Sequence, residues 1–302
     1  MTVLEVIQRS AGFLAKKGVD SPRLQVELLL AHALRMPRLQ LYLNFERTLT
    51  ETELETLRAF IKRRAGREPL QHILGSTSFC GVELAVNPRV LIPRPETELL
   101  AERARQFLHR LSDQEASSAV RNQRDACPTV LDFGTGSGCL AIVLALQCPG
   151  AKIHALDVSA AALAVARENA ARHLVNERIV FFEGDGFAGL PPGARYDLIV
   201  ANPPYIPAAE IEQLQPEVRD YDPRVALDGG ADGLDFYRRL AAEAPAFCRP
   251  GGTMMLEFGE GQAESIRELL ARKHWRVESV ERDDTRRERM LTARREEPLP
   301  AR

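Results

Sequence analysis

The feature that most limits the possible folds of this chain is a strand, a glycine-rich turn and an apolar helix in succession. They are read from "VLDFGTGSGCLAIVLA", residues 130–145, where Gly134, Gly136 and Gly138 occupy alternate positions. A turn from strand to helix needs glycine where φ is positive and where the backbone must approach a ligand. The N–H groups that open the helix can bind an anionic group. The pattern therefore predicts an α/β domain with a ligand site at this turn.

The rest of the chain from residue 129 alternates strand and helix patterns. Strands are expected at "TVLDFG", "KIHALD", "IVFFEG", "YDLIVAN" and "GGTMMLEFG", and helices at residues 137–147, 159–173, 232–247 and 260–273. Such alternation indicates βαβ units around a mostly parallel sheet. The segments "WRVESVERD" and "RERMLTAR" are expected to add an antiparallel C-terminal edge.

The N-terminal part of the chain, residues 1–75, has helical periodicity and predicts a bundle of four or five helices. Thr2 and Glu5 form a capping-box pattern, and Ser21 followed by Pro22 is typical of a second helix start. A β-hairpin linker is expected at residues 76–94, and an α/β domain at residues 95–295. Within that domain, a helix is expected at 95–110 and a polar flexible loop at 112–128, and a disordered tail is expected at 296–302.

Composition narrows the class of protein. The chain has 302 residues, a net charge of −2 and 27% charged residues, so no basic excess indicates nucleic-acid binding. No leader or long apolar run is present, and we expect a soluble, cytoplasmic, monomeric protein that binds no membrane. The five cysteines form no C-x-x-C pair and the six histidines are scattered, so no metal site is expected.

The glycine turn has three interpretations. A dinucleotide fingerprint needs a third glycine where Cys139 stands, and a purely structural turn needs no ligand. The G-x-G-x-G spacing resembles the first motif of class I S-adenosylmethionine-dependent methyltransferases. Asp157 follows the next strand, 19 residues after Gly138, where an acid accepts hydrogen bonds from ribose hydroxyls. Its alternative role is a helix cap, for which Ser159 is better placed.

Two further strands end in polar residues. Asp185 follows the third strand, where this class of methyltransferase places a group near the adenine amine, although a plain turn aspartate has the same pattern. The fourth strand ends in "NPPY", residues 202–205, and proline cannot continue a sheet ladder. This tetrapeptide resembles the signature of enzymes that methylate a conjugated NH₂ of adenine, cytosine or glutamine.

The chemistry explains these residue types. A conjugated nitrogen is a poor nucleophile because its lone pair is delocalised. If the enzyme accepts hydrogen bonds from both N–H groups of that nitrogen, the lone pair is encouraged to localise. The side-chain carbonyl of Asn202 can accept one hydrogen bond, and the backbone carbonyl of Pro203 can accept the other. Tyr205 offers a flat face for the planar group. A sulfonium methyl donor requires neither metal nor covalent intermediate, so the sequence predicts catalysis by alignment.

Residues 3–293 as a whole resemble the protein-(glutamine-N5) methyltransferases that modify peptide chain release factors. The resemblance is carried by "PLQHILGSTSFCGVELAVNPRVLIPRPETELL", "DFGTGSG", "ANPPYIP", "DPRVALDGGADGLDFYRRL" and "LEFGEGQ". It implies a class I S-adenosylmethionine-dependent methyltransferase fold, Rossmann-like, behind an N-terminal helical bundle. It also implies that the substrate is the glutamine of the Gly-Gly-Gln motif in class 1 release factors, which the bundle contacts.

The resemblance also implies the site residues. Donor binding falls to Gly134, Thr135, Gly136, Ser137, Gly138, Asp157, Asp185, Gly186, Phe187 and Asn202, and glutamine binding to Asn202, Pro203, Pro204 and Tyr205. The family often has a tryptophan where this chain has Gly186, so either Phe187 supplies the aromatic contact or the pocket is looser. Three linker residues either contact substrate or hold the domains together, namely Arg89, Arg94 and Glu96.

Two alternatives come from other classes. A DNA adenine-N6 methyltransferase shares the tetrapeptide but is expected to carry a basic target-recognition domain and a flipped-base pocket, which the balanced charge disfavours. A non-catalytic module that only binds S-adenosylmethionine or a partner leaves the intact "NPPY" unexplained.

Overall fold

The computed structural model describes residues 1–117 and 127–296 and divides the chain into two compact units. The helical unit contains residues 1–77 together with 214–221, and the sheet unit contains residues 78–213 and those from 222 onward. Most of the loop expected at 112–128 and nearly all of the expected tail lie outside the described residues. No helix in the described part of the chain has both the length and the apolar character needed to cross a bilayer.

The helical unit has five helices before residue 77, within the expected number. They are α1 (Val3–Lys16), α2 (Pro22–Leu34), α3 (Arg38–Leu43), α4 (Glu51–Ala65) and α5 (Leu70–Leu74). The capping box of Thr2 and Glu5 is present at the start of α1. The second helix begins at Pro22 after Ser21, as expected, but Ser21 has a φ of 45° and its side chain makes no capping hydrogen bond. A capping side chain needs extended backbone there.

A buried carboxylate fixes α3 against α2. Glu27 accepts hydrogen bonds from Arg38 at 2.8 Å and from the Tyr42 hydroxyl at 2.7 Å, and it also pairs with Arg23. Burial alone would raise the pKa of Glu27, but the hydrogen bonds from Tyr42 and the two arginines hold it below its usual value. The carboxylate therefore stays charged and holds α3 in place.

The helical unit also includes a segment that sequence reasoning placed within the α/β domain. Glu217, on the short helix α9 (Pro216–Arg219), pairs with Arg64 and Arg67 at 2.6 Å each. The Tyr221 hydroxyl donates to the carbonyl of Gly66 at 2.9 Å. Residues 214–221 therefore belong with helices that precede them by about 150 positions, which local sequence patterns cannot reveal.

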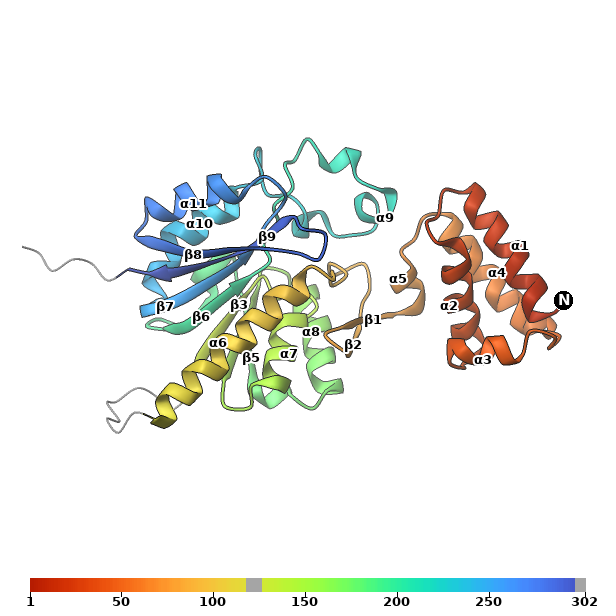
Figure 1. The fold of residues 1–302 in the computed structure, drawn as a ribbon, viewed down its shortest axis with the longest axis horizontal. Coiled ribbons are helices and arrows are strands. Elements are labelled where there is room, and N and C mark those ends of the chain that lie inside the picture. The colour runs from red at the N-terminus through yellow and green to blue at the C-terminus, as the bar shows by residue number, and fades with distance from the viewer. Residues whose placement is uncertain (118–126, 297–302) are drawn as a thin grey trace, which may run out of the picture. The chain divides into compact units, whose positions relative to one another are not determined.

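The sheet unit is built on seven strands in the order β5-β4-β3-β6-β7-β9-β8 (Figure 1). Their bounds are β3 (Thr129–Phe133), β4 (Lys152–Asp157), β5 (Ile179–Glu183), β6 (Tyr196–Ala201), β7 (Cys248–Glu257), β8 (Trp275–Arg282) and β9 (Glu288–Arg295). Strands β3 to β7 pair in parallel, and β9 pairs antiparallel with both β7 and β8. The mostly parallel sheet with an antiparallel C-terminal edge is confirmed.

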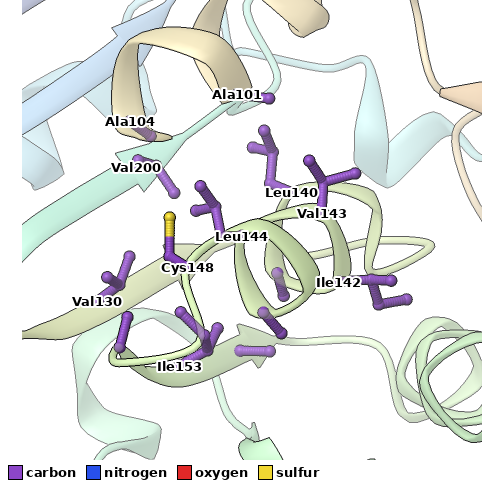
Figure 2. Close-up of a cluster of buried hydrophobic side chains, with 14 of the residues drawn as sticks. Ala101, Ala104, Val130, Leu140, Ile142, Val143, Leu144, Cys148, Ile153 and Val200 are labelled. Carbon is purple, nitrogen blue, oxygen red and sulfur yellow. The ribbon is translucent and has the colours of Figure 1, made fainter. Parts of the chain in front are cut away.

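Helices cover both faces of this sheet (Figure 1). One face carries α6 (Thr97–Ser117), α7 (Cys139–Gln147) and α8 (Ala160–Arg172), and the other carries α10 (Asp235–Glu243) and α11 (Ala263–Ala271). Figure 2 shows apolar side chains of α7 gathered with those of α6 and the strands, among them Leu140, Leu144, Ala101, Ala104, Val130 and Val200. Burial on nearly all sides explains why α7 is apolar from Leu140 to Ala145.

Two segments near the domain boundary refine the predictions. The expected hairpin is β1 (Ser76–Phe79) and β2 (Val82–Ala85), joined at Cys80 and Gly81, which both have positive φ. Helix α6 continues to Ser117, so the expected helix end near residue 110 and the expected loop at 112–117 are wrong. A polar segment without an apolar stripe can extend a helix where it has no core to cover.

Candidate active site

The carboxyl ends of β3, β4, β5 and β6 meet at one edge of the sheet, where open α/β sheets bind their ligands. The turn after β3 contains Gly134, Gly136 and Gly138 with φ of 77°, 54° and 83°. A Cβ atom at Gly134 or Gly136 would meet nothing within 4 Å, so both glycines border open space. A Cβ at Gly138 would lie 3.1 Å from Cβ of Ala166, so this glycine lets α7 approach α8.

Asp132, which sequence reasoning missed, holds the glycine turn from inside. Its buried carboxylate accepts hydrogen bonds from the Thr135 hydroxyl at 2.6 Å and from the backbone N–H of Ala141 at 3.1 Å. Burial raises the pKa of Asp132 to about 7. Thr135 and Ser137 are buried, so they support the turn without lining a cavity. The sequence did contain a signal for this role, because Asp132 is an acidic residue within an otherwise apolar strand.

Asp157 closes the next strand and faces the glycine turn. One carboxylate oxygen accepts the N–H of Gly136 at 2.8 Å, and the other accepts the N–H of Ser159 at 2.9 Å. Burial raises the pKa of Asp157, against the lowering effect of these hydrogen bonds. Ser159 caps α8 by accepting the N–H of Ala162 at 3.1 Å. Each oxygen of Asp157 keeps a lone pair for a ligand hydroxyl.

Asp185 and Gly186 follow β5 at the same edge. The Asp185 carboxylate is exposed and pairs with Arg239 of α10, and its backbone carbonyl accepts a second hydrogen bond from that side chain at 2.6 Å. Gly186 has a φ of 64°, and a Cβ at this position would overlap the Arg239 guanidinium. A planar cation therefore occupies the space that a larger residue at position 186 would need.

Phe187 does not supply the aromatic contact considered for the cavity, because its ring turns into the core. It stacks on Phe247 with ring centroids 4.8 Å apart and planes 20° apart, and it also contacts Phe133. It is buried and does not line the cavity. The half-buried Phe236 of α10 lines it instead. This residue lies within a quoted motif, but only the packing of α10 brings it to the site.

The "NPPY" residues leave the end of β6 and turn beside the cavity. The side-chain nitrogen Nδ2 of Asn202 donates to Oγ1 of Thr97 at 3.0 Å. Asn202, Pro203 and Pro204 line the cavity, whereas Tyr205 packs against the core of the α10 face. Burial raises the pKa of Tyr205 to about 12, so its hydroxyl stays protonated.

The segment from 222 to 233 braces this turn from behind. Ile206 donates to the carbonyl of Leu227 at 3.0 Å, and Gly229 donates back to the carbonyl of Ile206 at 2.9 Å. Gly233 has no Cβ, which lets its backbone lie against the carbonyl of Tyr205. The motif "DPRVALDGGADG" thus supports the tetrapeptide, although 16 residues lie between them.

The three linker candidates have different places, and Glu96 lies close enough to Glu257 to raise its pKa. Arg94 pairs with the buried Asp222 of the same unit, and therefore braces the segment behind the tetrapeptide. Arg89 lines the cavity. Burial raises the pKa of Asp222 to about 6, with Arg94 opposing that rise.

A cavity of about 260 Å³ lies among these loops. Eight predicted site residues line it: Gly134, Gly136, Asp157, Asp185, Gly186, Asn202, Pro203 and Pro204. Thr135, Ser137, Gly138, Phe187 and Tyr205 do not. Sequence reasoning missed several apolar walls, among them Val90, Leu91, Leu156, Val158, Ala162, Val225 and Phe236. A carboxylate beside apolar walls and glycine N–H groups fits a nucleoside, because ribose offers hydroxyl donors and the base needs an apolar slot.

Comparisons with known proteins show which proteins this chain resembles. A methyltransferase structure from Pyrococcus furiosus superposes with a TM-score of 0.51 and 18% identity, covering 73% of this chain and 92% of that one. Family models for the PrmC N-terminal domain and the methyltransferase small domain match residues 5–75 and 112–215. Release factor glutamine methyltransferases from Geobacter sulfurreducens and Chlorobaculum tepidum are each 47% identical, covering 90% and 89% of this chain and 89% of each relative.

Fold and site together define a class I S-adenosylmethionine-dependent methyltransferase. The sequence identity to these relatives extends over nine-tenths of the chain, and it identifies the family more specifically than the fold does. The chain belongs to the release factor glutamine methyltransferase family.

Proposed function

We propose that this protein transfers a methyl group from S-adenosylmethionine to the side-chain nitrogen N5 of the glutamine in the Gly-Gly-Gln motif of class 1 release factors. The observation that carries the proposal is the placement of Asn202 and Pro203 on the wall of a nucleoside-sized cavity. Relatives that are 47% identical bear the name of this activity. The role in translation termination, the cytoplasmic location and the monomeric state remain predictions.

The cavity residues suit the donor. Asp157 is placed to accept hydrogen bonds from ribose hydroxyls, and Gly134 and Gly136 leave the glycine turn open to the ligand. Phe236 and Leu156 offer apolar walls for the base. When bound, S-adenosylmethionine supplies an electrophilic methyl group on a sulfonium centre.

The tetrapeptide suits the acceptor glutamine. Asn202 and Pro203 each offer a carbonyl oxygen at the cavity wall. Together these oxygens accept hydrogen bonds from both N–H groups of the substrate amide. This orients the nitrogen lone pair toward the methyl group. Alignment of two reactants contributes roughly 7–11 kcal/mol to lowering a barrier. The surplus proton can leave after transfer, so the site needs no dedicated general base.

A methyl-labelling experiment tests the substrate. Purified protein incubated with methyl-labelled S-adenosylmethionine is expected to label a class 1 release factor at its Gly-Gly-Gln glutamine, located by peptide mass spectrometry. A release factor with that glutamine replaced by alanine is the control and should stay unlabelled. Labelling of adenine in duplex DNA, with none in the release factor, would overturn the proposal in favour of a DNA methyltransferase.

The helical unit is the proposed release-factor contact. Its short helix α3 exposes Leu39 and Leu43, with 78% and 85% of each residue accessible. Because they are four positions apart, both side chains lie on one face of the helix. Exposed apolar side chains grouped in this way are typical of protein contacts.

The double variant Leu39→Ser with Leu43→Ser is expected to raise KM for the release factor about tenfold, as for interface residues of moderate importance. The affinity for S-adenosylmethionine and the melting temperature should not change, because both side chains are exposed. Leu174→Ser is the matched control, since Leu174 is equally exposed but belongs to the sheet unit. An unchanged KM in the double variant would exclude this face of α3 as the contact.

A further inference from the structure

The orientation of the Asn202 amide decides whether it can act in the proposed reaction. A side-chain amide has an oxygen that accepts and an NH₂ group that donates, and the two exchange places on a half-turn. Only the oxygen can accept an N–H of the substrate glutamine. A half-turn of the Asn202 amide would place its NH₂ group against the NH₂ group of the substrate glutamine. Something in the protein must therefore hold the Asn202 NH₂ group away from the substrate.

Two buried side chains lie where they can do this. Thr97 begins α6 and is 2% exposed, and Glu257 ends β7 and is 1% exposed. Strands β6 and β7 run parallel with Ala201 opposite Leu256, so Asn202 and Glu257 are the next residues in register. The three side chains therefore meet although 160 positions separate the first from the last.

The hydrogen bonds among them use the NH₂ group of Asn202. One hydrogen bond runs from Nδ2 to Oγ1 of Thr97 at 3.0 Å. Thr97 and Asn202 also lie close enough to the Glu257 carboxyl to lower its pKa as hydrogen-bond donors. Within the described part of the chain, Oε2 of this carboxyl is buried and has no other hydrogen-bond partner, so it is free to accept the second Nδ2 hydrogen. A threonine hydroxyl has one hydrogen, and donating it to Glu257 leaves its lone pairs for Asn202. Among the described residues, none donates to Oδ1 of Asn202.

We propose that Thr97 and Glu257 are positioning residues that engage both Nδ2 hydrogens of Asn202 and so turn its carbonyl oxygen toward the substrate nitrogen. This inference rests on the proposed function. Neither residue lines the cavity, so both act through Asn202 and not by touching the substrate. Neither was among the residues that the sequence indicated.

The ionisation of Glu257 controls the direction of these hydrogen bonds. Burial raises the pKa of Glu257 to about 7, opposed by the hydrogen bonds from Thr97 and Asn202 and by the charge of Arg289. Glu96 also faces it and raises the pKa, and the rings of Tyr205 and Tyr237 and the thiol of Cys139 are close enough to sense its charge. Above neutrality the carboxylate accepts hydrogen bonds. Below neutrality, the protonated carboxyl of Glu257 donates a hydrogen bond itself, so it no longer holds the Asn202 NH₂ group in one orientation.

The first test compares three full-length variants with the wild-type protein, using a class 1 release factor as substrate. Thr97→Val removes the hydroxyl but keeps the shape, and we expect kcat to fall about tenfold or more, with KM for S-adenosylmethionine within about threefold of wild type. Thr97→Ser restores the hydroxyl and should restore kcat. Glu257→Gln should lower kcat and remove one group from the acidic side of its pH profile. An equal loss in Thr97→Val and Thr97→Ser would mean that Thr97 acts only by packing, and would overturn the proposal.

The second test needs no substrate and therefore separates this proposal from the proposed function. In protein with isotope-labelled asparagine side chains, the NMR signals of the Asn202 NH₂ group are assigned by their loss in Asn202→Ala. They are expected to exchange slowly with solvent and to titrate with an apparent pKa of about 7. The titration should vanish in Glu257→Gln, and slow exchange should be lost in Thr97→Val but kept in Thr97→Ser. Rapid exchange in the wild-type protein, or an unchanged titration in Glu257→Gln, would refute the arrangement even if the release factor is methylated. If the release factor is not methylated but these signals behave as expected, only the assigned substrate is wrong.

Discussion

Asn202→Ala is expected to lower kcat for release-factor methylation by about 10²–10³-fold, the usual loss when one pre-placed hydrogen-bonding group of an active site is removed. The variant loses the carbonyl that would accept one N–H of the substrate amide, so the nitrogen is no longer held in line with the methyl group. Binding of S-adenosylmethionine should change by less than about threefold, because Asp157 and the glycine turn remain intact.

Two measurements check this result. Single-turnover rates with saturating release factor give the chemical step, and calorimetric titration gives donor affinity. Asn176→Ala is the matched control, since Asn176 is an exposed asparagine of the same sheet unit far along the chain from the tetrapeptide. Undiminished turnover in Asn202→Ala would show that the tetrapeptide ends a strand and does nothing more.

Asp157→Ala is expected to have the largest effect on donor binding, raising the Kd for S-adenosylmethionine about 10²-fold. A hydrogen bond to a charged group contributes about 1.5–3 kcal/mol, and ribose offers two hydroxyls to this carboxylate. The variant also leaves the N–H groups of Gly136 and Ser159 without their acceptor, which loosens the turn. The rate at saturating donor should fall much less than the affinity.

The Asp157 result is separated from general damage by two comparisons. Asp157→Asn keeps one acceptor oxygen and should lie between wild type and Asp157→Ala in donor affinity. Asp284→Ala removes an exposed carboxylate of the same unit and should behave as wild type. A donor Kd that is unchanged in Asp157→Ala would leave Asp157 only its role in the turn.

Much of the fold follows from patterns that span fewer than about twenty residues. The alternation of strands and helices from residue 129 predicts the parallel sheet, and the antiparallel edge of β8 and β9 is confirmed. The capping box at Thr2 is present, whereas Ser21, at the start of α2, has a left-handed backbone and makes no capping hydrogen bond. A capping hydrogen bond depends on the backbone dihedral φ as well as on residue type, and the residue types Ser-Pro do not show φ.

The candidate site was predicted less evenly. Glycines with positive φ and prolines that end a strand mark the glycine turn and the tetrapeptide, because these residue types change what the backbone can do. Residue type alone does not show in which direction a side chain points. The sequence alone leaves Phe187 equally able to face the cavity or the core, and its stacking on Phe247 decides for the core.

The sequence by itself determined the local devices of this protein: the glycine turn, the acid at the end of the second strand, the Asn-Pro-Pro-Tyr turn and the family to which they point. Only the tertiary structure decided which distant residues complete them. Asp132 beneath the turn, Arg239 over Gly186, Phe236 on the cavity wall, and Thr97 with Glu257 around Asn202 all depend on strand order and helix packing. The physical reason is that backbone preferences act within a few residues, whereas a buried hydrogen bond forms between whichever polar groups the folded core brings together.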